Sequence, residues 1–105
     1  MSIYVYVTRK TDPFVTEPAI SADEWRQLVR SDPDLAIADP PDKSSADKTI
    51  YAEWKEYPGG YSAWFGLIDG NIEVKGLDAA ILGKLRNFAR VLGARIVSEE
   101  GEVFS

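Results

Sequence analysis

The dipeptide Asp69-Gly70 stands between two short segments in which apolar and polar residues alternate. Such alternation is typical of half-buried strands. A two-residue Asp-Gly connection favours a type I′ hairpin, because both central residues of that turn need positive φ. We therefore expect strands at about 61–68 and 71–75. The turn predicts the cross-strand pairs Ile68–Asn71, Leu67–Ile72 and Phe65–Val74.

A third strand is expected at about 48–57, joined to the hairpin by the turn residues 57–60. Only an even loop length puts Ile50, Ala52 and Trp54 on the apolar face of the hairpin, whereas an odd length would put Glu53 and Lys55 there. The hydrophobic pattern therefore selects the even register, because a slip of one residue moves every side chain to the other face. An alternating N-terminal segment, residues 3–8, predicts a further strand.

Two helices are expected. Ser21 and Glu24 form the pattern of a capping box, and Asp32-Pro33 ends the apolar periodicity that follows. Asp78 is the expected N-cap of a second helix that runs to about Leu92, before Gly93. Its basic residues are interpreted as a solvated helix face that suits the helix dipole; they are Lys84, Arg86 and Arg90.

Together these segments predict one α+β domain over residues 1–105, with a mostly antiparallel five- to six-stranded sheet and two helices packed on one face. Short strands at 35–38, 95–97 and 103–104 are the less regular candidates. The Pro-, Asp- and Ser-rich segment 39–47 is expected to be a surface loop. The pattern does not give the strand order.

The chain contains no histidine and no cysteine. It therefore lacks the side chains that most often act as a general base or a thiolate ligand near neutral pH. Because no motif for catalysis, metal binding or phosphate binding is visible either, we expect no catalytic residue, no metal site and no cofactor. The alternative is a small enzyme or small-ligand binder with a carboxylate-based site. For Glu53 and Glu73, however, the nearby Lys55 and Lys75 favour cross-strand salt bridges.

The net charge of -5 disfavours nucleic acid as a partner, because binding to phosphates needs a basic surface. The N-terminal segment has the pattern of a strand and lacks that of a signal peptide, and no apolar run approaches the roughly 20 residues that span a bilayer. We therefore expect a cytoplasmic protein that binds neither nucleic acid nor membrane.

The register places tyrosines and a tryptophan on the sheet face opposite the predicted core. Such side chains are enriched where proteins bind partners. We interpret this face as the binding surface for a protein partner, or for a second copy in a homodimer. Its candidate residues are Tyr4, Tyr6, Tyr51, Trp64, Glu53, Lys55, Glu73 and Lys75. The alternative is that these aromatics form cross-strand pairs covered by the loop 39–47.

Several stretches resemble a family of uncharacterised small bacterial proteins; they are Ile3–Arg9, Ile20–Trp25 with Ser31–Leu35, Trp64–Phe65 with Asp69–Lys75, and Leu92–Ala94 with Gly101–Phe104. They cover about half of the chain. The resemblance implies no established activity and assigns no functional residue, and the length of the loop 39–47 varies among the similar proteins. Small size, acidic charge and the absence of catalytic residues are also the general profile of immunity proteins, whose charge steers them toward a basic toxin.

Overall fold

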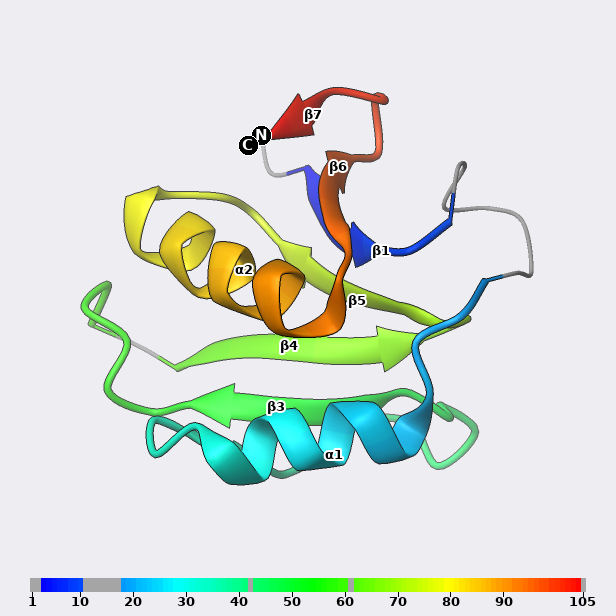
Figure 1. Cartoon of the computed structure of the whole chain (residues 1–105). Coiled ribbons are helices and arrows are strands. Elements are labelled where there is room, and N and C mark those ends of the chain that lie inside the picture. The colour runs from blue at the N-terminus through cyan, green and yellow to red at the C-terminus, as the bar shows by residue number, and fades with distance from the viewer. Residues whose placement is uncertain (1–2, 11–17, 42, 61, 105) are drawn as a thin grey trace.

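The computed structural model describes residues 3–10, 18–41, 43–60 and 62–104. These residues form two helices and one seven-stranded sheet (Figure 1). In chain order the elements are β1 (Tyr4–Thr8), α1 (Ala22–Ser31), β2 (Leu35–Ile37), β3 (Ile50–Trp54), β4 (Ala63–Ile68), β5 (Asn71–Lys75), α2 (Ala79–Leu92), β6 (Arg95–Ser98) and β7 (Val103–Phe104).

The order of the strands in the sheet is β2-β3-β4-β5-β1-β6-β7, and every neighbouring pair is antiparallel. The α+β class is confirmed, and the described sheet has more strands than the five or six expected. The two edge strands, β2 and β7, account for the difference. Both lie at the candidate positions 35–38 and 103–104, which were not counted with the regular strands because segments of two or three residues carry too little alternation.

The predicted hairpin is present between β4 and β5. Asp69 and Gly70 have φ of 52° and 78°, and Leu67 lies opposite Ile72. The paired stretch ends at Gly66 and Glu73, so the expected Phe65–Val74 pair falls one position beyond it. The register between β3 and β4 also follows the prediction, with Ala52 opposite Phe65.

The strand predicted at 48–57 is shorter than expected. β3 ends at Trp54, and Lys55 and Glu56 form a turn. The wrong boundary has a physical cause: Tyr57 continues the alternation of the strand, yet its buried ring packs beside Trp54 from a loop, with ring centroids 5.4 Å apart. Position 61, the expected start of the next strand, lies outside the described residues.

Both helices begin and end at the predicted residues. Ser21 accepts a hydrogen bond from the backbone N–H of Glu24, whose carboxylate accepts one from Ser21 in return. Asp78 caps α2, and Gly93 follows it in the left-handed conformation. No helix in the described ranges combines the length and the apolar character needed to cross a bilayer.

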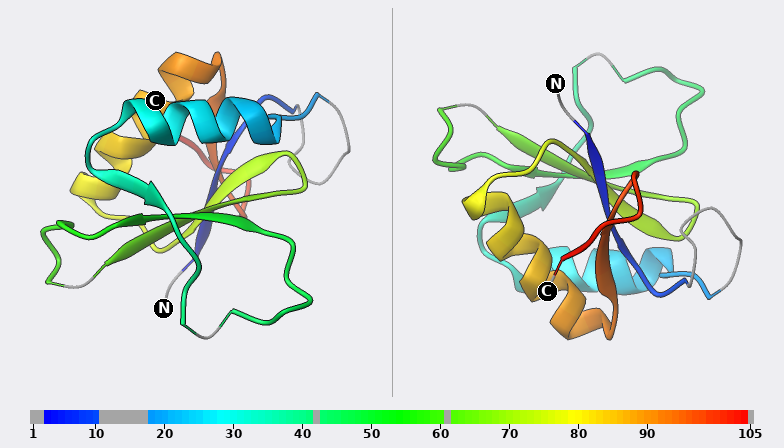
Figure 2. Two further views of the ribbon diagram at one scale, coloured as in Figure 1. Left: turned by 90° about the horizontal axis from the view of Figure 1, so that it is seen from below. Right: turned by 90° about the horizontal axis from the view of Figure 1, so that it is seen from above.

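The core lies between the helices and one face of the sheet (Figures 1 and 2). Trp25 of α1 and Phe65 of β4 both pack edge-on against Phe88 of α2, with centroid separations of 5.6 and 5.3 Å. The indole N–H of Trp25 donates to the carbonyl oxygen of Ile50. These contacts join the two helices and the sheet in one apolar cluster.

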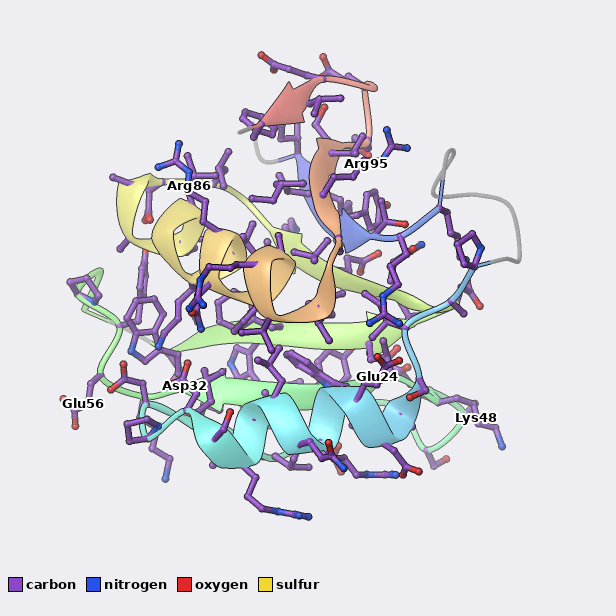
Figure 3. All side chains as sticks on the ribbon, viewed as in Figure 1. Glu24, Asp32, Lys48, Glu56, Arg86 and Arg95 are labelled. Carbon is purple, nitrogen blue, oxygen red and sulfur yellow. The ribbon has the colours of Figure 1, made fainter. Side chains whose placement is uncertain are left out.

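Three ion pairs tie the helices to their surroundings. Two of their carboxylates belong to Glu24, at the start of α1, and Asp32, at its end (Figure 3), and the third belongs to Asp34. Arg9 pairs with Glu24, and Lys84 of α2 pairs with Asp32 while its ammonium lies 4.9 Å from the ring centroid of Trp54. The interpretation of Lys84 as part of a solvated helix face is therefore wrong. The Lys84 ammonium binds the loop after α1.

Candidate functional site

The face of the sheet opposite the core is called the outer face here. Its central row crosses six strands and consists of Tyr51, Gly66, Glu73, Tyr6, Val97 and Val103. A neighbouring row holds Glu53 opposite Trp64, and Tyr4 lies opposite Lys75. The register thus places seven of the eight predicted partner-binding residues on this face.

Apolar exposure is concentrated on the outer face. Among the described residues the exposed large apolar side chains are Tyr4, Ile37, Ile68, Val91 and Val103. Three of these five, Tyr4, Ile68 and Val103, lie on the outer face. Tyr6, Tyr51, Trp64 and Glu73 are half-buried. The outer face therefore combines exposed apolar side chains with partly sheltered aromatic ones.

Tyr51 lies across Gly66 of the neighbouring strand. A Cβ at Gly66 would come within 3.2 Å of the Tyr51 ring and 2.6 Å of the Thr49 methyl group, so only glycine leaves room for this arrangement. The Tyr51 ring then meets Trp64 edge-on at 6.4 Å. Glycine in mid-strand thus lets the aromatic pair lie close to the sheet.

The loop 39–47 reaches one side of the outer face. The Tyr51 hydroxyl donates to Asp47 at 2.9 Å, and the Lys43 ammonium lies 5.6 Å from the centre of the Tyr51 ring. This part matches the alternative in which the loop covers the aromatics. Tyr4, on the far side of Glu73, remains 37% exposed.

Glu73 lies at the centre of the face, between Gly66 and Tyr6. Burial raises the pKa of its carboxyl group, and the charges of Asp69, Asp47 and Glu99 raise that pKa further. In the described part of the chain no lysine or arginine forms an ion pair with Glu73. The outer face therefore has a negative centre that nothing described here neutralises.

Tyrosines flank this carboxylate. Burial raises the pKa of Tyr6, and so do the charges of Glu73 and Glu99. Burial is also the main reason why the pKa of Tyr51 is raised, followed by its hydrogen bond to Asp47. Both phenols therefore stay protonated at neutral pH and keep their hydroxyl donors.

The predicted salt bridges on this face were wrong. Lys55 lies past the end of β3 in an exposed turn, and Lys75 lies opposite Tyr4 and forms no ion pair with a described residue. Glu53 instead accepts a hydrogen bond of 2.6 Å from the hydroxyl of Ser62. Because β4 lies between the strands of Glu53 and Glu73, the two carboxylates do not form a cross-strand pair.

Sequence reasoning missed several residues that shape the face. Asp47 and Asp69 come from a loop and a turn, and their approach to Glu73 depends on tertiary structure. Gly66 carried a usable signal, because an isolated glycine inside a strand pattern often marks a close approach by another group. Over the described ranges, no three acidic side chains are arranged to hold a metal ion.

Comparisons with protein families, with curated proteins and with solved structures find no match to this chain. The resemblance to uncharacterised bacterial proteins therefore remains a prediction from sequence, and any function must be argued from the outer face itself.

Proposed function

We propose that this chain is a non-enzymatic protein-binding module, immunity-like or regulatory, whose outer face holds a basic segment of a protein partner. The observation that carries the proposal is Glu73, a half-buried carboxylate with a raised pKa and no cationic partner among the described residues. A carboxylate in such a place gains most from an external cation, because burial makes it poorly solvated.

The chemistry around Glu73 favours an arginine or lysine side chain as that cation. A guanidinium can bind a carboxylate through two parallel hydrogen bonds, and its flat face stacks on aromatic rings. Tyr6 and Tyr51 flank the carboxylate, and the exposed Tyr4 lies nearby on the same strand as Tyr6. Cations near tyrosine or tryptophan rings gain about 0.5–2 kcal/mol.

The overall charge supports the same choice. The net charge of -5 attracts a basic protein at long range and speeds the encounter. Trp64 adds an anchor, since its indole N–H has no hydrogen-bond partner among the described residues. Tryptophan and tyrosine are frequent hot spots of protein interfaces.

The test is a titration of the ¹⁵N-labelled chain with two capped peptides that share a Gly-Ser framework, one carrying arginines and the other glutamates. The proposal expects the arginine peptide to shift amides of β5, β1 and β4 around Glu73. Glu73→Gln should weaken that binding about tenfold, the effect of losing a partly buried charged hydrogen bond. Asp23→Asn, which removes the same charge from the exposed side of α1, should leave the affinity unchanged.

A clear result would overturn the proposal. If Glu73→Gln and a folded Trp64→Ser variant bind the arginine peptide as tightly as the wild type, the outer face is not the site. Light scattering on the chain alone provides the second readout. A dimer that dissociates in Trp64→Ser would assign the face to a second copy of the chain instead.

A further inference from the structure

A second surface lies at the edge of the sheet, away from the outer face. β2 is the terminal strand on one side, and the left view of Figure 2 looks onto this edge, with β2 in front of β3 and α1 alongside. A groove of about 460 Å³ runs between α1 and β2. Arg26, Val29 and Arg30 line it from the helix, and Leu35, Ala36 and Ile37 line it from the strand.

The backbone of β2 is open on the groove side. The N–H of Ala38 donates to the carbonyl of Tyr51, so Ala38–Tyr51 is a hydrogen-bonded pair of the antiparallel ladder. Such pairs alternate with pairs whose peptide groups point away from each other. Ile37, opposite Ala52, therefore directs both its N–H and its C=O away from β3, toward the open edge. One residue with both groups free can pair with a residue of an added strand.

The side chain of Ile37 adds an apolar contact at the same place. It lies on the helix-facing side of β2, the side of the buried Leu35, yet it is 48% exposed. The neighbouring Ala36, on the other side of the strand, leaves the edge sterically accessible. An extended segment could therefore approach β2 closely and bury Ile37.

The groove is positively charged although the chain is acidic. Arg26 and Arg30 are exposed, and neither forms an ion pair with another described residue. The acidic residue at the groove, Asp32, already pairs with Lys84 at 2.8 Å. The charge available to an incoming group is therefore that of two guanidinium groups.

The spacing of these arginines matches an extended chain. Residues four apart in a helix are separated by about 6 Å along the axis, and residues two apart in a strand by about 6.8 Å. Figure 1 shows α1 lying along the direction of β3, to which β2 is paired. Two acidic side chains at alternate positions of a strand added to β2 would therefore face Arg26 and Arg30 together.

We propose that this edge binds an extended acidic peptide segment of a protein partner, which adds to β2 as an eighth strand of the described sheet. Main-chain hydrogen bonds to Ile37 hold the strand, as in other cases of strand addition. Two acidic residues at alternate positions pair with Arg26 and Arg30. This site takes the opposite charge from the outer face and does not depend on the function proposed there.

The probe is a capped peptide of alternating valine and glutamate, compared with the same peptide carrying lysine in place of glutamate. The proposal expects the glutamate peptide to shift the amides of β2 and of the last two turns of α1, and to protect the Ile37 amide from hydrogen exchange. The lysine peptide should bind at least tenfold more weakly. Shifts confined to the outer face, or equal binding of both peptides, would overturn the proposal.

Two variants separate charge from backbone pairing. Arg26→Gln/Arg30→Gln should weaken binding about tenfold, since two exposed ion pairs together give an effect of that size. Lys48→Gln/Arg90→Gln removes the same charge elsewhere and should not change the affinity. Ile37→Pro removes the outward N–H while leaving the pairing with β3, and should abolish binding, whereas Ile37→Val should retain it.

Self-association is the remaining outcome to measure. If the chain alone forms dimers by light scattering, and Ile37→Pro converts them to monomers, β2 pairs with a second copy of itself. That result would replace the acidic segment as the occupant and overturn the proposal.

Discussion

Replacing Glu24 by glutamine tests how the chain joins three of its elements. The Glu24 carboxylate accepts hydrogen bonds of 2.8 and 2.5 Å from the guanidinium of Arg9, and Arg9 also donates from Nε to the carbonyl of Leu92. These contacts connect the end of β1, the first turn of α1 and the last turn of α2. The hydrogen bonds from Arg9, and then that from the backbone of Ser21, lower the pKa of Glu24 from 4.5 to about 2.

The size of the effect follows from that pKa. A fall from 4.5 to about 2 corresponds to roughly 3 kcal/mol if it is fully retained. The Glu24 side chain is 38% exposed, so solvent screening reduces this to about 1–1.5 kcal/mol. Glu24→Gln should lower the free energy of unfolding by that amount at pH 7, and lower Tm by roughly 5–10 °C in a domain of this size.

The pH dependence tests the cause. Because the pKa of Glu24 is lower in the folded state, the stability that its ionised carboxylate contributes is present above about pH 4.5 and is lost as the pH falls toward 2. Urea unfolding of wild type and Glu24→Gln at pH 7, 4 and 3 should therefore show a difference in the free energy of unfolding, called the gap below, that narrows at the lowest pH. Asp23→Asn in the same helical turn is the control. A gap of equal size at pH 7 and pH 3 would refute the assignment to the carboxylate charge.

Three further substitutions probe the helix contact and the outer face. Lys84→Met should lower the free energy of unfolding, measured in urea, by about 2 kcal/mol, because it leaves the Asp32 carboxylate without its cation and that side chain is only 9% exposed. Adding Asp32→Asn should recover part of the lost free energy. Glu73→Gln should stabilise at pH 7, since the raised pKa marks an unfavourable charge; the gain should vanish in acid-range unfolding curves, where Glu73 is protonated. Gly66→Ala should cost about 1–3 kcal/mol by crowding Tyr51, and should shift tryptophan emission. An unshifted spectrum and unchanged stability would show that Tyr51 does not rest on this glycine.

Local signals predicted most of the fold. The capping box at Ser21, the N-cap at Asp78 and the positive φ at Asp69 and Gly70 all depend on residues within a few positions of one another. The alternation of apolar residues then determined the register of β3 against β4. The order of the strands depends on long-range packing, for which a single sequence carries no local pattern.

The outer face was predictable as a set of side chains that share one side of the sheet, and not as an electrostatic site. Alternation places Tyr51 and Glu73 on one face. The charge state of Glu73, however, depends on Asp47 and Asp69, which reach it from separate loops. The salt bridge expected for Lys55 is absent for a related reason: β3 ends at Trp54, before Lys55, although the alternation continues to Tyr57.

The position of β1 within the sheet has a consequence for how the chain reaches its native state. β2, β3, β4 and β5 are neighbours both in sequence and in space, so they can pair soon after each leaves the ribosome. β1 is synthesised before them but lies between β5 and β6, and its partners are distant. The Thr8 hydroxyl donates to Asn71, 63 positions later, and the carbonyl of Lys10, two residues past the strand, accepts from Arg95, 85 positions later. Closing loops of this length is slow, because the entropy of loop closure is lost before the contacts that compensate for that loss can form. Until β6 is made, one edge of β1, an interior strand of the finished sheet, stays open. During synthesis, the nascent chain therefore passes through a stage in which this unpaired strand edge is exposed to chaperones and to aggregation.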